Sequence, residues 1–237
     1  MVSDRLFRRC YPGHWHDGSA AFYGWVRQSL RPDMRILNIG AGPATGNAVR
    51  TLRGEVSCVV GADPDPAVLH NAELDEAYVI EGGRLPFSDD AFDLAYADYV
   101  LEHVEHPREF LAEARRVLKP GAPFFFRTPN RRHYVALIAR GTPHRFHVLL
   151  ANRVRGLPPD AHEPWVTFYR LNGAGQIRRA ARAAGFVSCE LRLFEPEPSY
   201  LMFSAPAFLL GVAYERLVNA TDLLSGLRAN IFGKLVK

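Results

Sequence analysis

A glycine-rich segment that follows an apolar run constrains this 237-residue chain more than any other feature. Residues 36–46 read ILNIGAGPATG, which predicts a strand ending in closely spaced glycines and a helix over 45–52. Glycines at such a junction let the backbone approach a nucleotide-like ligand, and the N–H groups of the following helix would point at that ligand. A second apolar run, residues 56–62, ends at Asp63, where an acid can hold the two hydroxyls of a ribose. Together these features predict a nucleotide-binding α/β fold.

The glycine spacing separates two kinds of ligand. A dinucleotide fingerprint reads G-x-G-x-x-G, but here Gly40 and Gly42 are followed by Gly46, one position late. The spacing therefore disfavours pyrophosphate and favours a smaller nucleoside ligand with an amino-acid tail.

Four sequence blocks follow one another in the first half of the chain. They are the glycine segment 36–46, GADP at 61–64, EGGRLPF at 81–87 running into AFDL at 91–94, and LEHV at 101–104 leading to VLKPG at 117–121. In this order they resemble the class I S-adenosylmethionine-dependent methyltransferases, especially the group with ubiquinone-type and small-molecule methylases. The resemblance covers roughly residues 33 to 130. Three positions depart from the usual family pattern: Asn38 replaces an acid, and Ala44 and Ala122 replace glycines.

Apolar strand-like runs alternate with amphipathic helices, which predicts a parallel sheet covered on both faces. The resemblance makes this a Rossmann-like, doubly wound, seven-stranded, mostly parallel sheet with an antiparallel last strand and cap insertions. Strands are predicted at 35–39, 56–62, 77–80, 92–97, 123–128, 186–194 and 230–236. Helices are predicted at 45–52, 65–71, 107–117 and 172–184.

One methyltransferase domain is predicted over residues 1–237. Within it, residues 1–32 form an N-terminal lid or helix and residues 33–130 form the cofactor-binding core. Residues 131–170 and 195–228 are cap insertions.

The resemblance also implies a cofactor, S-adenosyl-L-methionine, and the residues that hold it. The family pattern places Asn38 and the backbone of Gly40, Ala41 and Gly42 along the methionine moiety. It places Asp63, followed by Pro64, on the ribose hydroxyls. Glu81 and Gly82 fall on the adenine side, and Asp98 and Tyr99 beside the methionine and the reacting methyl group.

Structural roles compete with these functional ones. Asp63 and Pro64 could simply cap the following helix, and Glu81 could be an exposed acid after a strand. Asn38 could contact the ligand or bond the end of its own strand.

Two histidines fall where an acceptor would meet the cofactor, His103 beyond the fourth strand and His133 beyond the fifth. Histidine takes up a proton near neutral pH, so each is a candidate general base. His103 could instead shape the pocket. The pairs His103/His106 and His144/His147 have helical spacing, but no carboxylate pattern completes a metal site, and none is predicted.

Composition excludes several classes of protein. The chain has 29 basic and 25 acidic residues, a formal charge of +4, which is too mild an excess to indicate nucleic-acid binding. Three widely spaced cysteines form neither a disulfide framework nor a zinc pattern. The N-terminus lacks the apolar region of a signal peptide, so a cytoplasmic protein is expected.

Two segments lie outside the minimal sheet, an arginine-rich one at 131–170 and an apolar run at 200–214. The run is shorter than a membrane span and Pro206 interrupts it. Together the segments suit an amphiphilic, anionic acceptor or a peripheral dock on the inner face of an anionic membrane. The competing interpretation is that the run packs onto the domain or forms a homodimer face, and that the arginines are solvated.

The leading functional hypothesis is a methyltransferase acting on a small-molecule or lipid-linked acceptor, at an oxygen atom. A nicotinamide-dependent oxidoreductase is the alternative from another enzyme class. A non-catalytic nucleoside-binding module is the alternative without chemistry.

Overall fold

A computed structural model describes residues 2–13, 17–141 and 166–237. The chain divides into two compact units. The first, here called the helical unit, comprises Met1–Ala21, Pro129–Val166 and Leu193–Asn230. The second, here called the sheet unit, comprises Phe22–Thr128, Thr167–Arg192 and Ile231–Lys237.

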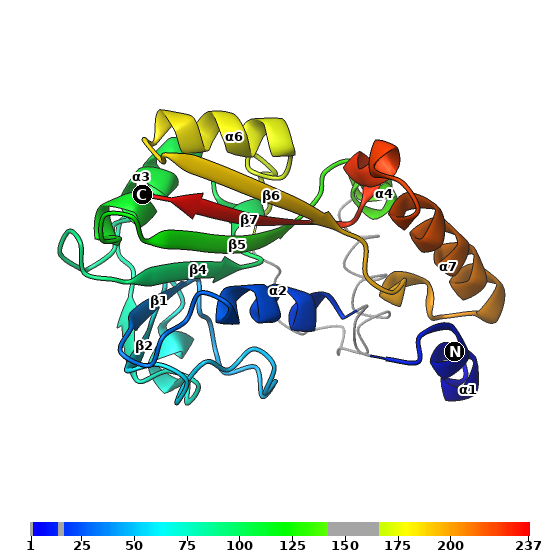
Figure 1. The fold of residues 1–237 in the computed structure, drawn as a ribbon, viewed down its shortest axis with the longest axis horizontal. Helices are drawn as coiled ribbons and strands as arrows, with labels where there is room; N and C mark the ends of the chain where they lie inside the picture. Colours follow the sequence, from blue (N-terminus) through cyan, green and yellow to red (C-terminus); the bar gives the residue numbers. More distant parts are fainter. Residues whose placement is uncertain (1, 14–16, 142–165) are drawn as a thin grey trace. The chain divides into compact units, whose positions relative to one another are not determined.

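Seven strands form one sheet in the order β3-β2-β1-β4-β5-β7-β6 (Figure 1). β1 to β5 are mutually parallel where they pair, and β7 runs against β5. The antiparallel direction of β7 follows from its end bonds: Gly121 N–H donates to Lys237 O, and Asn130 N–H donates to Ala229 O. The predicted fold class is confirmed. The strands are β1 Arg35–Ile39, β2 Cys58–Asp63, β3 Glu76–Val79, β4 Leu94–Asp98, β5 Pro123–Pro129, β6 Ser188–Phe194 and β7 Asn230–Val236.

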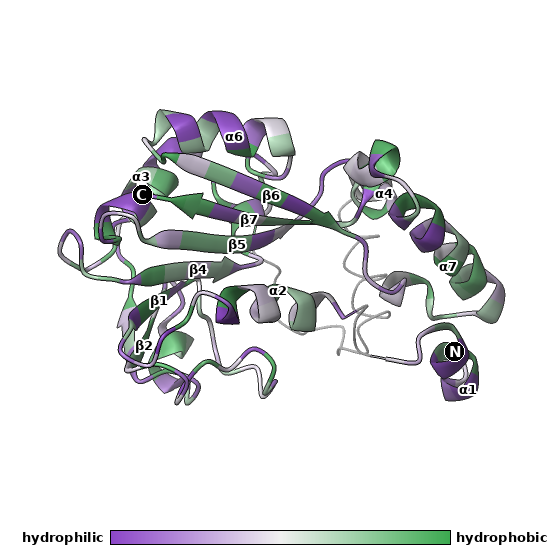
Figure 2. Cartoon of the chain, viewed as in Figure 1, coloured by the Kyte–Doolittle hydropathy of each residue, from purple (hydrophilic) through white to green (hydrophobic). Residues whose placement is uncertain are grey.

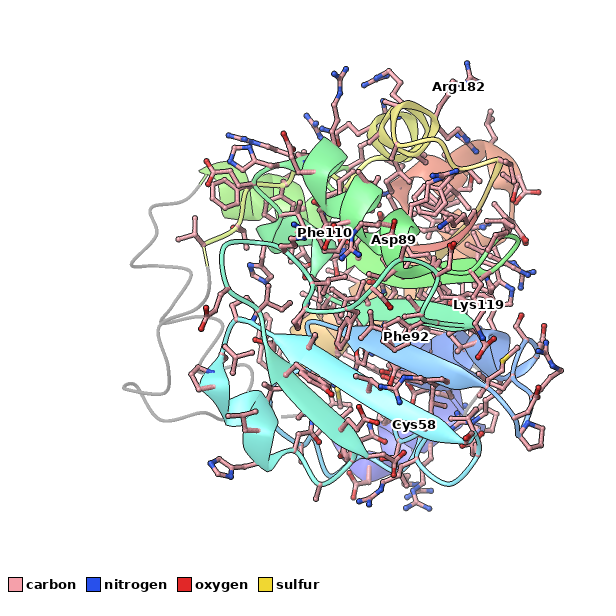
Figure 3. The ribbon with its side chains drawn as sticks, turned by 90° about the vertical axis from the view of Figure 1, so that its left-hand side faces the viewer. Cys58, Asp89, Phe92, Phe110, Lys119 and Arg182 are labelled. Carbon is pink, nitrogen blue, oxygen red and sulfur yellow. The ribbon has the colours of Figure 1, made fainter. Side chains whose placement is uncertain are left out.

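Alternate residues of each strand serve the two faces of the sheet, as the two-residue period of a strand requires. One face packs against α3 Pro107–Val117 and α6 Ala174–Ala183 through Leu111, Ala114, Ile177 and other apolar side chains. Figure 3 shows Phe110 on α3 and Phe92 by the sheet, while Arg182 points outward from α6.

The other face of the sheet packs against α2 Gly18–Arg27 through aromatic rings. Trp25 meets Phe125 edge-on at 5.1 Å between ring centroids, and Tyr23 meets Tyr96 at 6.1 Å. α2 therefore covers the same face from which the side chains of Tyr96 and Phe125 project.

The helix predicted at 45–52 is wrong, because these residues form turns. Gly46 has a φ of 67°, which an α-helix excludes. The Arg27 guanidinium donates to Val49 O at 2.9 Å and Thr51 O at 3.0 Å, and Glu73 accepts from the Gly46 N–H at 2.7 Å. Side chains from elsewhere in the sheet unit thus take up backbone groups that a helix would have paired internally.

The other helices agree with the sequence to different degrees. α3 and α6 lie where helices were predicted, at 107–117 and 172–184. The predicted helix at 65–71 is a short 3-10 helix, η2 Pro66–His70. Another 3-10 helix, η3 Leu101–His103, follows β4.

The helical unit contains α1 Asp4–Cys10, α4 Tyr134–Gly141 and α7 Ala205–Asn219, with short 3-10 helices η4 Ser199–Leu201 and η5 Asp222–Leu227. The apolar run 200–214 supplies most of α7. In the part of the chain described above, no helix is long and apolar enough to cross a membrane. Of the predicted cap 131–170, residues 142–165 lie outside the described residues, and the His144/His147 pair with them.

Candidate functional site

The candidate site lies at the carboxyl ends of β1, β4 and β5, on the face covered by α2. Parallel register places Asn38 opposite Tyr96, and Asp98 opposite Arg127. Because residues two apart share a face, Asn38, Asp98 and Arg127 all project to one side of the sheet. A cavity of about 20 Å³ lies here, and its lining includes Asn38, Gly40, Ala41, Arg50 and Asp98. Four predicted cofactor residues are thus brought together, and Arg50 joins them.

Asp98 is the most heavily bonded acid of the site. Arg127 donates from Nε to Oδ1 and from Nη2 to Oδ2, the second at 2.9 Å. Arg50 lies 2.8 Å from Oδ2, and the Tyr23 hydroxyl donates to the same oxygen at 3.0 Å. Burial, and then the Asp98 charge, raises the pKa of the Tyr23 phenol, so this hydroxyl remains a donor. Asp98 therefore acts here as a clamp for two arginines and a tyrosine.

Two polar atoms beside this clamp are buried without a hydrogen-bond partner. They are the Oδ1 of Asn38, an acceptor, and the Nε of Arg50, a donor. Leaving such atoms unpaired costs free energy, so a ligand that pairs them gains affinity. An acceptor and a cationic donor in one cavity match the ammonium and carboxylate of an α-amino acid.

The Asp63 carboxylate bonds the backbone of the glycine loop. The Oδ2 of Asp63 accepts from Gly42 N–H at 2.9 Å, and its Oδ1 accepts from Asp65 N–H at 2.7 Å. Gly40 and Gly42 have φ of 76° and 54°, in the left-handed region that favours glycine. Burial raises the pKa of Asp63. Its carboxylate retains free lone-pair capacity, because each oxygen accepts one bond from the backbone and can accept another.

The competing cap role for Asp63 does not match the structure. The residue that caps η2 is Asp65, whose Oδ1 accepts from Ala67 N–H at 2.9 Å. Pro64 joins Asp63 to this cap at the end of β2.

Glu81 and Gly82 lie in a tight turn after β3. Glu81 and Arg84 form an antiparallel bridge, and Gly82 and Gly83 between them have φ of 60° and 74°. Positive φ at both central residues is the geometry of a type I′ turn, which demands residues such as glycine. Glu81, with Phe87, lines an open hollow of about 580 Å³.

Tyr99 and His103 follow β4. Tyr99 has a φ of 59°, and the Arg127 guanidinium lies 4.6 Å from its ring centroid. His103 ends η3 as a half-buried side chain. Among the described residues, no cluster of histidine, cysteine and acidic side chains could hold a metal ion.

A buried carboxyl next to His103 was missed by sequence reasoning. Burial raises the pKa of Glu102 to about 7. Thr128 Oγ1 donates to Glu102 at 3.1 Å and accepts from Asn172 Nδ2 at 2.6 Å. Only the presence of an acid inside the LEHV block could have pointed to Glu102, because Thr128, which bonds it, and Asn172, which bonds Thr128, lie 26 and 70 positions further along the sequence.

His133, the second candidate base, belongs to the helical unit. Its Nε2 lies 3.2 Å from the Oε1 of Glu195, and both side chains are buried. The rings of Tyr134 and Tyr214 pack against it at centroid distances of 4.1 and 5.7 Å. A role in proton transfer for His133 stays a prediction.

The glycine loop, the acid at the end of β2 and the cavity at the carboxyl ends of the strands define a nucleotide-binding α/β protein. Residues 37–126 match the family model described as "Methyltransferase domain". The chain is 30% identical to a demethylmenaquinone methyltransferase of Clavibacter sepedonicus over 175 residues, 67% of each chain. It is 28% identical to a ubiquinone biosynthesis O-methyltransferase of Hahella chejuensis, over 68% of this chain and 66% of that protein. Other curated relatives are matched over only 31% to 49% of their own length.

The fold is similar to that of a SAM-dependent methyltransferase from Archaeoglobus fulgidus, with a TM-score of 0.57 at 14% identity over 98% of this chain and 99% of that one. The chain belongs to the class I S-adenosylmethionine-dependent methyltransferase family.

Proposed function

We propose that this protein is an S-adenosylmethionine-dependent methyltransferase that acts on a small-molecule acceptor, at an oxygen atom. The observation that carries the proposal is the pair of unpartnered buried atoms, Asn38 Oδ1 and Arg50 Nε, in the cavity beside the glycine loop. They complement the amino-acid end of the cofactor, and Asp63 complements its ribose.

The residues of this chain fit the cofactor in three places. Asn38 would accept from its ammonium group and Arg50 would donate to its carboxylate. Gly40 and Ala41 would line the methionine with backbone, since both border the cavity. Asp63 would accept from the ribose hydroxyls while still bonding Gly42 N–H.

When bound, the cofactor supplies an electrophilic methyl group on a sulfonium centre. The protein then has to hold the acceptor in line with that group and exclude water. The Asp98 clamp fixes Arg50, Arg127 and Tyr23 beside the methionine end of the site. The fixed positions lower the entropic cost of aligning donor and acceptor.

An oxygen acceptor has to lose its proton during the transfer. His103, at the end of η3, is the candidate base in the sheet unit, because imidazole accepts a proton near neutral pH. The names of two relatives, a demethylmenaquinone methyltransferase and a ubiquinone biosynthesis O-methyltransferase, support a quinone-type acceptor, and the second name supports oxygen as the methylated atom.

Turnover tests this proposal. The protein is incubated with S-adenosylmethionine and a panel of acceptors, namely hydroxylated benzoquinols and naphthoquinols with short or long prenyl tails and a simple phenol. We expect S-adenosylhomocysteine to form with at least one quinol, and the methyl group to appear on oxygen in the product. His103→Gln should then lower kcat while leaving cofactor affinity unchanged, with His106→Gln as the exposed control.

Three other results would reject parts of the proposal. Binding of NAD in place of S-adenosylmethionine in calorimetry would favour the oxidoreductase. Tight cofactor binding without turnover on any acceptor would favour the non-catalytic module. A methylated carbon or nitrogen would reject the choice of oxygen.

A further inference from the structure

α7, in the helical unit, has an unusual distribution of side chains. The buried side of this 15-residue helix carries Phe208, Gly211, Val212, Glu215 and Val218. The exposed side carries Pro206, Leu209, Leu210, Ala213 and Leu217, here called the α7 outer face. Leu210 and Leu217 are 71% and 60% exposed, and Phe203 just before the helix is 58% exposed. The outward side of a helix in a globular protein is normally polar, so an apolar outer face indicates an interaction site.

The acid of α7 lies on its buried side. Glu215 accepts from the Tyr11 hydroxyl at 3.2 Å and from Asn219 Nδ2 at 2.7 Å. Arg216 is the one charged residue on the exposed side of α7. The exposed side of α7 therefore combines the apolar outer face with one positive charge, that of Arg216, and carries no negative charge.

More positive charge lies on α1, which packs against α7 within the same unit. The rings of Phe7 and Tyr11 lie 6.0 and 6.2 Å from the ring of Phe208. This contact leaves Arg5, Arg8 and Arg9 exposed on α1, with Asp4 as the one exposed acid. Figure 2 shows the contrast between a largely hydrophilic α1 and a largely hydrophobic α7.

Arg216 connects α7 to α1. Its Nη2 donates to the carbonyl of Cys10, the last residue of α1, at 3.5 Å. It precedes Leu217 and lies one turn beyond Ala213, so it adjoins the apolar side chains as well. Arg216 thus places a positive charge beside the apolar side chains of α7, and α1 adds three further exposed arginines to the same unit.

We propose that the α7 outer face and the arginines of α1 dock this protein on the surface of an anionic lipid bilayer. Apolar side chains on a helix of this length enter the boundary between headgroups and acyl chains, and arginines pair with anionic headgroups. A second copy of the chain is the poorer partner. A two-fold dimer would bury this patch against its own copy, and α7 offers no exposed acid to pair with the arginines, because Glu215 is buried.

Co-sedimentation of the full chain with vesicles tests the proposal. One set of vesicles contains phosphatidylcholine alone and the other contains phosphatidylcholine with phosphatidylglycerol, each at low and moderate salt. We expect binding to the anionic vesicles that weakens with salt, because screening shortens the reach of the arginines. Leu210→Gln/Leu217→Gln should lower the partition coefficient at least tenfold. Arg5→Ser/Arg8→Ser/Arg9→Ser should lower it and flatten the salt dependence.

One matched control variant and two measurements on every variant keep the result specific. Val187→Gln removes an apolar side chain that is 77% exposed in the sheet unit, and should leave vesicle binding unchanged. Thermal unfolding and binding of S-adenosylmethionine should be unchanged in every variant, and Leu209→Gln replaces the double variant if that one is unstable. Because cofactor binding is measured separately, its failure in the parent would reject the proposed function and not the membrane dock.

Three results would overturn the proposal. The parent could fail to sediment with anionic vesicles at either salt. The Leu210→Gln/Leu217→Gln variant could sediment with anionic vesicles as well as the parent does. The parent could also be a dimer that Leu210→Gln/Leu217→Gln converts to a monomer, without vesicle binding in either form, which would assign the face to a second copy.

Discussion

Arg127 lies directly opposite Asp98 on neighbouring parallel strands, and its guanidinium donates to both oxygens of that carboxylate. Both side chains are almost fully buried, with 3% and 4% of their side-chain surface exposed. Removing one member of such a pair strands the other charge in a medium where it cannot be solvated.

Arg127→Met should therefore lower the free energy of unfolding by about 3 kcal/mol, on the scale of broken buried pairs. The cost stays below the upper end of that range because Arg50 and Tyr23 still bond Asp98. Urea unfolding of Arg127→Met, Asp98→Asn and the double variant would measure the coupling. The double variant should lose less than the sum of the two single variants.

Arg192→Met is the matched control for Arg127→Met. Arg192 also lies over an aromatic ring, that of Trp25, and pairs with Glu190, but about half of its side chain is exposed. Arg192→Met should lower the free energy of unfolding by less than about 1 kcal/mol. An equal loss of unfolding free energy in Arg127→Met and Arg192→Met would show that burial does not strengthen the Arg127–Asp98 pair.

Arg50→Met should weaken S-adenosylhomocysteine but not 5′-methylthioadenosine, which lacks the amino-acid end. A hydrogen bond to a charged group contributes roughly 1.5–3 kcal/mol, so we expect a rise of roughly 10- to 150-fold in the Kd for S-adenosylhomocysteine. Arg53→Met, which removes a surface pair with Asp75 from the same loop, is the control. Calorimetry that gives the same loss for both ligands would show that Arg50 acts on the whole loop.

Asp63→Ala should raise the Kd for S-adenosylmethionine by a factor that corresponds to roughly 2–3 kcal/mol. Asp65→Ala is its control, because that side chain caps η2 and should affect stability by about 1 kcal/mol without affecting affinity. Since Asp63 also bonds Gly42 N–H, unfolding curves must accompany the titrations. An unchanged affinity for S-adenosylmethionine in a folded Asp63→Ala protein would show that Asp63 does not hold the ribose.

Gly40→Ala and Gly42→Ala distinguish two reasons for glycine in the loop, the positive φ of the backbone and the lack of space for a Cβ. Both positions have positive φ, which costs a side-chain-bearing residue roughly 1–2 kcal/mol. A Cβ on Gly40 would also lie 2.3 Å from Val100 Cγ2, whereas a Cβ on Gly42 meets nothing within 4 Å. Gly40→Ala should therefore be the more destabilising, and Val100→Ala should partly rescue it. If thermal unfolding shows no rescue of Gly40→Ala by Val100→Ala, the loss of stability comes from the positive φ of the backbone alone.

The stability of the protein should fall as the pH rises from about 4.5 to 7. Burial raises the pKa of Glu102 from 4.5 to about 7, so the unfolded chain releases this proton first. The folded state therefore binds more protons in this window and loses stability with rising pH, by up to about 3 kcal/mol.

Glu102→Gln should flatten that dependence and raise the free energy of unfolding at pH 8 relative to the parent. Glu105→Gln, at an exposed neighbouring position, should not. Glu197, whose pKa burial also raises to about 7, should leave part of the dependence in both variants. A Glu102→Gln profile that runs parallel to the parent's would show that Glu102 ionises freely in the folded state.

Strands β1 to β5 were predictable because each is a short, mostly apolar run that ends at or just before a glycine, a proline or an acid, and every predicted strand overlaps an observed one. The irregular backbone at 45–52, where a helix was predicted, was not predictable, because its backbone groups are taken by Arg27 and Glu73, which are distant in sequence. Arg50 was missed for a similar reason. No motif marks it, and its importance arises only when the loop brings it to Asp98, 48 positions later. Local patterns thus predicted the elements, and long-range pairing decided the site.

The position of β7 between β5 and β6 has a consequence for how the chain is made. During synthesis β5 and β6 both emerge before residues 230–236, so each carries an open hydrogen-bonding edge until the last strand arrives. Insertion of that strand joins residues more than one hundred positions apart, as in the bond between Gly121 and Lys237, and such pairing is slow. The nascent protein therefore exposes two strand edges that are prone to edge-to-edge pairing until residues 230–236 have left the ribosome.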